Sequence, residues 1–192
     1  MENEKKLALV LFGSPHKNGN TNKMLEIFKS NINGYEFAHI NAYDLNIKPC
    51  IDCKHCQTSP SCIYDDFKCI DILLNKADLL IVASPIYNLS FPAPLKAIFD
   101  RMQIYYSTRF YKNIKPPIKK VKRGIVLITC GSNDDLGMKI ISRQLHMIFS
   151  IINTTVINEI LWKNIDKNED ISNIEKEVIL AAKNITSKNN KA

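Results

Sequence analysis

Residues 7–28, LALVLFGSPHKNGNTNKMLEIF, decide the fold of this chain. The uncharged apolar run 7–12 is typical of a parallel strand that is covered on both faces of a sheet. Two glycines and several polar residues follow it, and apolar residues return at helical spacing from Met24 onward. The stretch therefore predicts a buried strand, a polar turn and a helix that begins near Asn20 or Thr21.

The polar turn before this helix has the composition of an anion site. The first backbone N–H groups of a helix have no partner within the helix, and the helix dipole adds a positive potential, so both favour a phosphate there. An ordinary strand-to-helix turn capped by Asn20 or Thr21 is the alternative, because helix caps use the same residue types. The composition of the turn is compatible with both interpretations.

Two common phosphate motifs are absent from the turn. A nucleoside-triphosphate loop requires Gly-Lys followed by Ser or Thr, whereas Gly19 is followed by Asn20. A dinucleotide fingerprint requires Gly-x-Gly-x-x-Gly, whereas Pro15 stands two positions after Gly13. What remains is a loop rich in Ser, Thr and Asn, which suits a single phosphate monoester held by neutral donors.

The turn 13–25, GSPHKNGNTNKML, resembles the GSPR-x-x-GNT phosphate loop of the NAD(P)H-dependent FMN reductase group of flavodoxin-like proteins. The resemblance implies FMN as cofactor, with its phosphate held by Ser14, His16, Asn18, Asn20, Thr21 and Asn22. His16 stands where the family usually has arginine, so a titratable side chain replaces a permanent positive charge. We expect this replacement to weaken phosphate binding without abolishing it.

Composition favours one domain over 1–192, since 45% of the 192 residues are hydrophobic and suffice for a sizeable core. No apolar run has the length of a membrane span, and the charged start lacks the pattern of a signal peptide. We therefore expect a cytoplasmic protein without a membrane partner. Six cysteines in a reducing compartment favour free, catalytic or metal-bound thiols over disulfides.

The net charge of +7 is unevenly distributed. Positions 112–123 hold six basic and no acidic residues, within a connecting segment expected over 108–123. A solvated linker is the favoured interpretation, and a docking patch for an acidic redox partner or a nucleotide phosphate is the alternative. No recognition helix or aromatic-basic platform supports nucleic-acid binding.

Strands and helices alternate along the chain. The expected strands are 7–12, 35–44, 77–83, 125–130 and 154–162. Two helices are expected to begin near residues 20 and 66, and three more to span about 95–106, 136–149 and 171–185. We expect the polar tail 186–192 to fray. This alternation predicts an α/β fold, a flavodoxin-like doubly wound five-stranded parallel sheet with strand order 2-1-3-4-5. In such a sheet the loops after strands one, three and four converge on one ligand site.

The loop 84–101, SPIYNLSFPAPLKAIFDR, resembles the isoalloxazine loop SP-x-Y-x-x-x-x-P-x-x-LK-x-x-x-DR of the same family. A flavin ring needs an apolar slot and backbone N–H groups near N5 and the pyrimidine carbonyls. We expect these from Pro85, Ile86, Tyr87, Asn88 and Leu89, and from Cys130 and Gly131 in the loop 129–133. Ordinary packing of Tyr87 and Phe91 is the alternative.

The loop 48–66 carries Cys50, Cys53, Cys56 and Cys62 in the spacing C-x2-C-x2-C-x5-C. Three thiols at intervals of three, with a fourth nearby, are the set that a [4Fe-4S] cluster needs. Four-thiolate zinc normally uses two separated Cys-x-x-Cys pairs, and zinc or free thiols are the alternatives. The pattern resembles the compact cysteine motif of the iron-sulfur flavoproteins, relatives of the FMN reductases that bind such a cluster beside FMN.

These resemblances imply an FMN flavoprotein that passes electrons between FMN and a cluster, with NAD(P)H or a ferredoxin-like protein as donor. Catalysis would depend on positioning and redox tuning by backbone donors, so no catalytic acid or base is named. The family also implies a homodimer or a dimer of dimers. The competing interpretations are a metal-free NAD(P)H:flavin or quinone reductase, a non-enzymatic electron carrier, and a zinc-stapled binding module with an empty flavin site.

Overall fold

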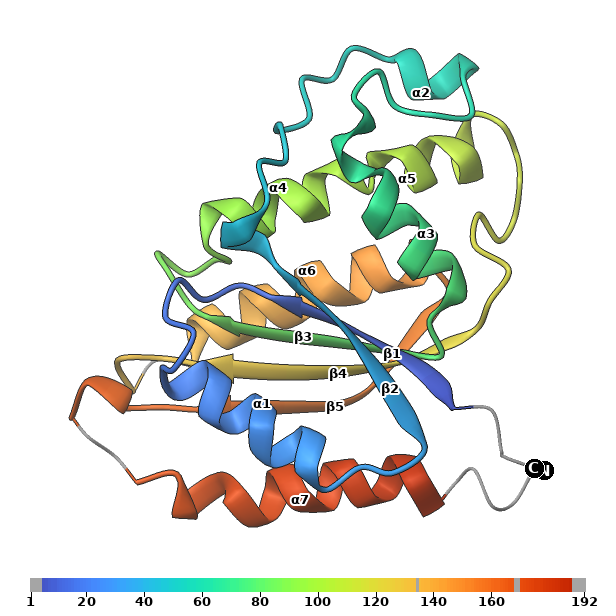
Figure 1. The fold of residues 1–192 in the computed structure, drawn as a ribbon. Helices are drawn as coiled ribbons and strands as arrows, with labels where there is room; N and C mark the ends of the chain where they lie inside the picture. Colours follow the sequence, from blue (N-terminus) through green and yellow to red (C-terminus); the bar gives the residue numbers. More distant parts are fainter. Residues whose placement is uncertain (1–4, 134, 168–169, 188–192) are drawn as a thin grey trace.

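A five-stranded parallel sheet lies at the centre of the computed structural model, which describes residues 5–133, 135–167 and 170–187 (Figure 1). In spatial order its strands are β2 (Tyr35–Asn41), β1 (Lys6–Phe12), β3 (Leu79–Pro85), β4 (Lys122–Thr129) and β5 (Thr154–Trp162). Every neighbouring pair is parallel. The predicted flavodoxin-like α/β fold and its strand order 2-1-3-4-5 are confirmed.

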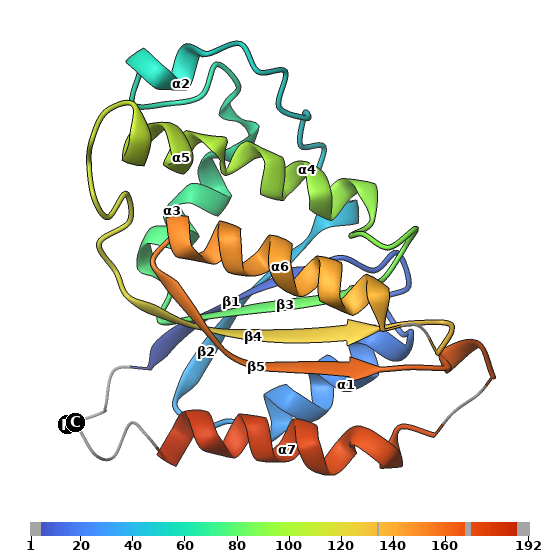
Figure 2. The same cartoon turned by 180° about the vertical axis from the view of Figure 1, so that it is seen from behind.

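Helices cover both faces of the sheet: α1 (Asn20–Ser30), α3 (Lys68–Lys76), α4 (Ala93–Arg101), α5 (Gln103–Phe110), α6 (Leu136–Ile151) and α7 (Ser172–Ser187). The short helix α2 (His55–Thr58) lies farther out, against α5 (Figure 1). Two opposite views show α1 and α7 on one face and α3, α4, α5 and α6 on the other (Figure 1, Figure 2). α7 includes the first two residues of the tail predicted at 186–192, and 188–192 lie outside the described residues. Within the described ranges, no helix combines the length and the apolar character needed to cross a membrane.

Side chains that alternate along the strands build a core on each side of the sheet. In β1, Leu9 and Leu11 pack into the layer of α3 to α6, whereas Val10 and Phe12 pack toward α1 and α7. All four are at most 1% exposed, which explains why β1 is continuously apolar in sequence. Burial on both faces fixes the carboxyl end of the strand, where the polar turn begins.

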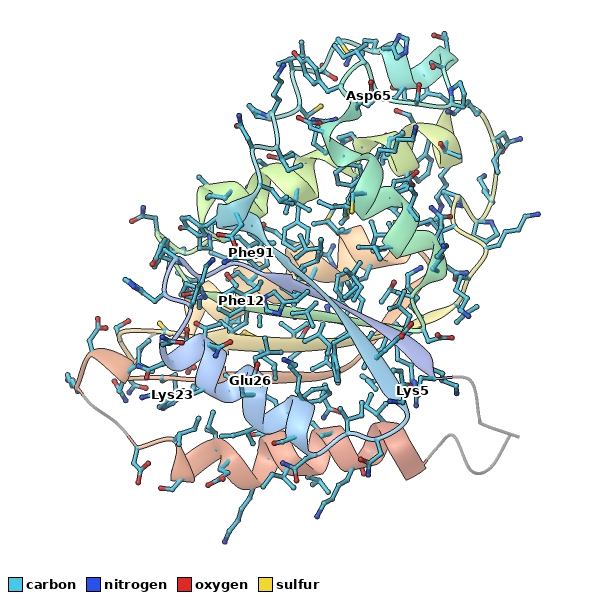
Figure 3. The ribbon with its side chains drawn as sticks, in the orientation of Figure 1. Lys5, Phe12, Lys23, Glu26, Asp65 and Phe91 are labelled. Atoms are coloured by element: carbon cyan, nitrogen blue, oxygen red, sulfur yellow. The ribbon has the colours of Figure 1, made fainter. Side chains whose placement is uncertain are left out.

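Helix α1 shows the amphipathic pattern that places its first turn. Met24, Leu25 and Phe28 are fully buried against the sheet and α7. Lys23 and Glu26 point from the opposite side of the helix toward solvent (Figure 3). The apolar side therefore fixes the helix axis and brings its N-terminus to the carboxyl edge of the sheet.

The second strand is shorter than predicted. It was expected over 35–44 but ends at Asn41, whose side chain accepts a hydrogen bond from the Tyr43 N–H (3.0 Å). This bond begins a 3-10 helix, η1 (Ala42–Asp44). Asparagine can therefore end a strand here by offering the backbone an alternative partner.

The helix predicted over 95–106 is two helices, α4 and α5. At Met102 the backbone N–H bonds the Phe99 carbonyl three residues back (3.1 Å), and α5 then begins. This tighter turn interrupts the regular pattern of bonds four residues apart. The apolar periodicity of the sequence continues through this break, so the sequence pattern did not reveal that the helix is interrupted.

Neither Asp65 nor Asp66 caps the helix that was predicted to begin there. A 3-10 turn, η2 (Asp65–Phe67), leads into α3 instead. Asp66 accepts a hydrogen bond from the Lys48 N–H (2.8 Å) and pairs with the guanidinium of Arg101 (2.7 Å). Its carboxylate thus joins the two ends of the cysteine loop.

The basic segment predicted over 108–123 is only partly a solvated linker. Helix α5 extends to Phe110, and β4 begins at Lys122. The side chain of Lys122 is 1% exposed, and its Nζ donates to the Lys120 carbonyl (3.1 Å). Lys122 is buried because it belongs to a strand that has neighbours on both sides.

Candidate functional site

A cavity of about 670 Å³ opens at the carboxyl ends of β1, β3 and β4. The strand order reverses between β1 and β3, and ligands bind outside this switch point in sheets of this type. The cavity is lined by Ser14, His16, Gly19, Asn20, Thr21, Pro85, Ile86, Tyr87, Asn88, Leu89, Thr129, Cys130, Gly131, Ser132, Gly137, Ile165 and Asp166. Its volume is typical of small-molecule and cofactor sites.

The structure brings the three predicted loops together in this cavity. Every site residue predicted in the second and third loops lines it, and in the first loop only Asn18 and Asn22 do not. Asn18 is exposed and Asn22 is half-buried. His16 lines the cavity from an exposed position at its edge.

The first loop leaves the sheet through a close approach at Gly13. The Gly13 N–H donates to the Ala83 carbonyl (2.8 Å), which extends the pairing of β1 with β3 by one residue. A Cβ atom at this position would lie 2.5 Å from Leu95 Cδ2 and 2.7 Å from Ser84 Oγ. Only glycine fits here without displacing α4 or the end of β3.

The N-terminus of α1 is free of side-chain capping. Gly19 is the cap residue, and no side chain bonds the first N–H groups of the helix. The loop instead folds on itself, since His16 N–H donates to Ser14 Oγ (3.2 Å) and Gly19 N–H to the His16 carbonyl (3.0 Å). The alternative of a turn capped by Asn20 or Thr21 is not realised, and the first turn of α1 lines the cavity.

Thr21 connects the first loop to the third. Its Oγ1 lies 2.8 Å from Thr129 Oγ1 at the end of β4, and both hydroxyls are buried. Because a buried polar group is costly unless it is hydrogen-bonded, this pair fixes α1 against β4. The two loops therefore hold a defined separation before any ligand enters.

The second loop contains a tight turn formed by residues 87–90. The N–H and carbonyl groups of Tyr87 and Ser90 bond each other (2.9 Å each), and Asn88 and Leu89 have φ values of 50° and 60°. Positive φ at both central residues defines a type I′ turn, which favours glycine or asparagine over leucine. Leu89 therefore occupies a strained backbone position at the wall of the cavity.

This turn changes which backbone donors are available. The Ile86 N–H donates to the Thr129 carbonyl (2.9 Å), and the Tyr87 N–H is used within the turn. Of the donors expected over 86–89, those of Asn88 and Leu89 remain without a protein acceptor in the described part of the chain. The number of donors left for a ligand is therefore half of that expected.

The third loop is fixed by the end of β5. The Cys130 N–H donates to the Trp162 carbonyl (2.8 Å), and its carbonyl accepts the Ile165 N–H (3.2 Å). The carboxylate of Asp166 lies so close to Gly131 that any Cβ atom there would collide with it. Gly131 is thus required by a close approach, and Asp166 brings a negative charge to the cavity.

Sequence reasoning did not name Gly19, Gly137, Ile165 and Asp166 as lining residues, and it included Thr129 and Ser132 only as part of the loop 129–133. Gly137 belongs to α6, and a Cβ atom there would lie 3.0 Å from Ile86 Cγ2. Gly131, two residues after the end of β4, was the only local signal. Nothing in the sequence around Asp166 indicates that its side chain packs against that glycine.

A second cavity, of about 140 Å³, lies between the cysteine loop and the helices α4 and α5. Asp65, at the end of that loop, is labelled at the upper end of Figure 3. It is lined by all four predicted ligands, Cys50, Cys53, Cys56 and Cys62, together with residues of α4 and α5. Within the described ranges, no three Cys, His, Asp or Glu side chains are arranged as a preformed metal site. The four thiols therefore share one cavity without already being drawn together as ligands.

Arg101 holds both ends of the cysteine loop. Its side chain is buried, and it donates to the carbonyls of Lys48 (2.9 Å) and Tyr64 (3.0 Å) while it pairs with Asp66 (2.7 Å). Burial alone would raise the pKa of Asp66, but the Lys48 N–H and the Arg101 guanidinium lower it below its usual value. The carboxylate is thus kept ionised and opposite its cation.

Four further polar residues near the two sites line neither cavity. Lys96 and Asp100, one turn apart on α4, form an ion pair (2.5 Å). His55 is exposed on α2, and Cys69 is exposed on α3.

The fold and the larger cavity define a class of protein, the flavodoxin-like α/β proteins that hold a phosphorylated cofactor at the switch point of the sheet. The chain belongs to the NADPH-dependent FMN reductase family, which matches residues 7–167. The matched segment includes all three loops of the cavity and the whole cysteine loop.

Individual relatives are more distant. Over 127 residues the chain is 29% identical to the iron-sulfur flavoprotein of Archaeoglobus fulgidus, covering 65% of this chain and 54% of that protein. Over 96 residues it is 36% identical to the iron-sulfur flavoprotein of Methanosarcina thermophila, covering 46% of this chain and 48% of that protein. The chain thus spans about half the length of these two relatives. A solved NAD(P)H:quinone oxidoreductase from Methanothermobacter marburgensis has a TM-score of 0.70, with 18% identity over 93% of this chain and 92% of that one, and supports the fold.

Proposed function

We propose that this chain binds FMN in the 670 Å³ cavity and acts as an NAD(P)H-dependent oxidoreductase. The observation that carries the proposal is the convergence of three separate loops on a switch-point cavity that contains an uncapped helix N-terminus. Family membership supports the cofactor and the type of reaction.

The residues of the first loop fit a phosphate. The free N–H groups of the first turn of α1 and the helix dipole favour an anion, and Ser14, Asn20 and Thr21 add neutral polar groups on the same wall. Among the residues that the structure describes, no lysine or arginine lines this cavity, so the helix N-terminus is the main source of positive potential there. His16 adds positive charge only when it is protonated.

The second and third loops fit a flavin ring. Ile86, Tyr87 and Leu89 provide apolar surface, and the N–H groups of Asn88 and Leu89 provide donors. Bound FMN supplies a ring that accepts a hydride or single electrons, and donors near the ring stabilise the negative charge of its reduced form. The protein's contribution is thus binding, orientation and electrostatics, without a catalytic acid or base.

A Ser14→Ala variant tests the cofactor site. We expect wild-type protein to be yellow and to release FMN on denaturation, and the variant to bind FMN more weakly. Ser30→Ala is the matched control, since Ser30 is exposed at the other end of α1 and bonds the Ile27 carbonyl (3.0 Å). A colourless protein that does not bind added FMN would refute the proposal.

The reductase activity is tested with NADH and NADPH as donors and free flavin or a quinone as acceptor. Steady oxidation of either nucleotide, dependent on FMN, is the expected result. Slow reaction with both nucleotides and rapid reduction by a ferredoxin-like protein would instead identify an electron carrier.

The cysteine cavity extends the proposal to a [4Fe-4S] cluster held by Cys50, Cys53, Cys56 and Cys62. Four thiols on one cavity are a donor set that fits such a cluster, and two relatives are named iron-sulfur flavoproteins. A cluster supplies one-electron transfer. Zinc bound to the same thiols, or four free thiols, are the other outcomes of a metal analysis.

Iron and acid-labile sulfide analysis of protein purified without oxygen tests the cluster. We expect wild type to contain iron and sulfide, and Cys53→Ser to lose most of both. Cys69→Ser is the matched control, because Cys69 is an exposed thiol on α3 outside the cavity. A yellow protein without iron would support a metal-free reductase, and zinc without FMN would support a stapled binding module.

The proposal includes a homodimer or a dimer of dimers in the cytoplasm, with NAD(P)H or a ferredoxin-like protein as electron donor. Tyr87 and Leu89 remain 42% and 38% exposed at the wall of the flavin cavity, which favours a second subunit as cover. Light scattering coupled to size exclusion measures the assembly, and a monomer at micromolar concentration would contradict it.

A further inference from the structure

Ser107 places a buried hydroxyl beside one of the four cysteines. It lies on α5, its side chain is 4% exposed, and its Oγ is 3.2 Å from Sγ of Cys56. Its backbone is fixed as well, because the Ser107 carbonyl accepts the N–H groups of Tyr111 (2.9 Å) and Lys112 (3.1 Å) at the end of the helix. The hydroxyl therefore meets the sulfur from a rigid position.

The next residue on the same helix uses its hydroxyl differently. Thr108 Oγ1 donates to the Ile104 carbonyl one turn back (2.9 Å), which is the ordinary arrangement for a hydroxyl inside a helix. Ser107 Oγ is directed at sulfur instead. A metal-bound thiolate can only accept a hydrogen bond, so the serine is the donor when Cys56 is a ligand.

The same cavity contains a second unused donor. Arg101 lines it, is 2% exposed, and its Nε has no hydrogen-bond partner among the residues that the structure describes. The wall formed by α4 and α5 thus holds a hydroxyl 3.2 Å from one sulfur and an unbonded Nε–H of a guanidinium whose charge is paired with Asp66.

We propose that Ser107 is a positioning and tuning residue of the cysteine site, whose hydroxyl donates to Cys56 Sγ and raises the reduction potential of the cluster held there. This inference rests on the proposed function. Reduction by one electron increases the negative charge on the ligand sulfurs, so a hydrogen bond to sulfur is stronger in the reduced state and favours it. A serine that only filled space would have no such effect.

The test compares Ser107→Ala with wild type, both purified without oxygen and with equal iron and sulfide content. Loss of one hydrogen bond is expected to change the equilibrium of one-electron reduction by about three- to tenfold, a lowering of the potential by up to about 59 mV. Potentials are measured by dye-mediated titration with detection of the reduced cluster. Ser107→Thr keeps the hydroxyl and is expected to keep most of the wild-type potential.

Thr108→Val is the matched control, because it removes a hydroxyl one residue away that bonds the backbone and not the sulfur. We expect its potential to equal that of wild type. An unchanged potential in Ser107→Ala, or an equal lowering in Thr108→Val, would overturn the inference.

Metal content separates this inference from the proposed function. Wild-type protein that holds no iron, even after reconstitution with iron and sulfide, would overturn the cluster and the role of Ser107 together. Iron in wild type with an unchanged potential in Ser107→Ala would overturn the role of Ser107 alone. If Ser107→Ala loses the cluster, retention in Ser107→Thr supports the hydroxyl contact and loss in both variants contradicts it.

Discussion

His16 leaves the 670 Å³ cavity, where we propose that FMN binds, with little fixed positive charge. It lines the cavity edge from an exposed position, in the place where arginine is usual in the resembling phosphate loop. Arginine would carry a permanent charge and a forked set of donors that matches phosphate. The binding of a dianion then depends on the helix N-terminus and on uncharged donors.

His16→Arg is therefore expected to tighten FMN binding. We expect a gain of about three- to tenfold at low ionic strength, reduced by added salt because the site is exposed. Quenching of FMN fluorescence measures the affinity. Lys17→Arg is the control, since Lys17 is exposed and paired with Asp44 (2.8 Å). Unchanged affinity in His16→Arg would show that the helix N-terminus already suffices.

Lys122 is a buried cation at the start of β4. Burial, with the charge of Lys120 nearby, lowers the pKa of Lys122 from 10.5 to about 8. In the unfolded chain the amine keeps its ordinary affinity for protons, so between these pH values the unfolded state binds more protons. The cost of burying Lys122 therefore lowers the free energy of unfolding most below about pH 8. This cost decreases, and the folded state becomes more stable, as the pH rises from about 8 to 10.5.

Lys122→Met is expected to stabilise the protein at pH 7, by as much as about 3 kcal/mol, because it removes the cost of a buried charge. The advantage over wild type should shrink as the pH approaches 10. Urea unfolding at both pH values measures the difference. Lys119→Met, at an exposed neighbouring position, should show neither effect. A Lys122→Met variant less stable than wild type at pH 7 would contradict the argument.

Among the elements, the cysteine loop depends on α4 for its shape. Arg101, the last residue of α4, bonds Lys48 and Tyr64 near the two ends of the loop and pairs with Asp66. Before η2 begins at Asp65, the loop contains only the short helix α2, which packs against α5. The contacts that hold the thiols around one cavity thus come mainly from the helices below it.

Arg101→Gln should release the ends of this loop. We expect a loss of about 3 kcal/mol, because the change leaves the Asp66 carboxylate without its buried partner. Cleavage by proteases within 48–66 should also accelerate. Arg109→Gln is the control, since Arg109 bonds the Ser150 carbonyl (3.0 Å) away from the loop. Equal effects of both variants would show that Arg101 has no special role.

In the whole molecule, α4 and α5 run between the two candidate sites. α4 begins just after the turn at 87–90 that lines the flavin cavity, and α5 lines the cysteine cavity with Ser107 and Ile104. Phe91 and Phe99 pack edge to face where α4 enters the core, with their ring centroids 4.8 Å apart. The two cavities are thus connected by rigid elements and not by a flexible linker.

Bound FMN should raise the free energy of unfolding of the whole protein, whereas it should restrict backbone motion only in the loops that contact it. At a free FMN concentration one hundred times the Kd, mass action predicts a gain of about 2.7 kcal/mol in the free energy of unfolding. Hydrogen exchange should slow most in the first turn of α1, in 85–89 and in 129–132, and little in 48–66. Equal slowing in the cysteine loop would show that the two sites are coupled on FMN binding.

The sheet order and the three loops could be predicted because each depends on a local pattern. Apolar runs mark strands that are buried on both faces, and parallel strands bring their following loops to one edge. Asp166 and Gly137 could not be predicted, since they enter the site only by packing against Gly131 and Ile86. Lys122 was assigned to a solvated segment because its neighbours are basic, whereas it begins β4 and pairs there with Thr154 of β5.

The closure of the cysteine loop by Arg101 has a consequence for protein engineering. Both ends of the loop are held by one guanidinium through the Lys48 and Tyr64 carbonyls, which any amino acid could supply at those positions. We therefore expect foreign metal-binding sequences to be accepted within 49–63 where they keep the packing of α2 on α5 and the bond from Lys112 Nζ to the Ser59 carbonyl (2.7 Å). Doubling its length should cost only about 0.6 kcal/mol in closure entropy. The contacts of Arg101 would then let this fold carry other metal-binding segments beside the cavity proposed for FMN.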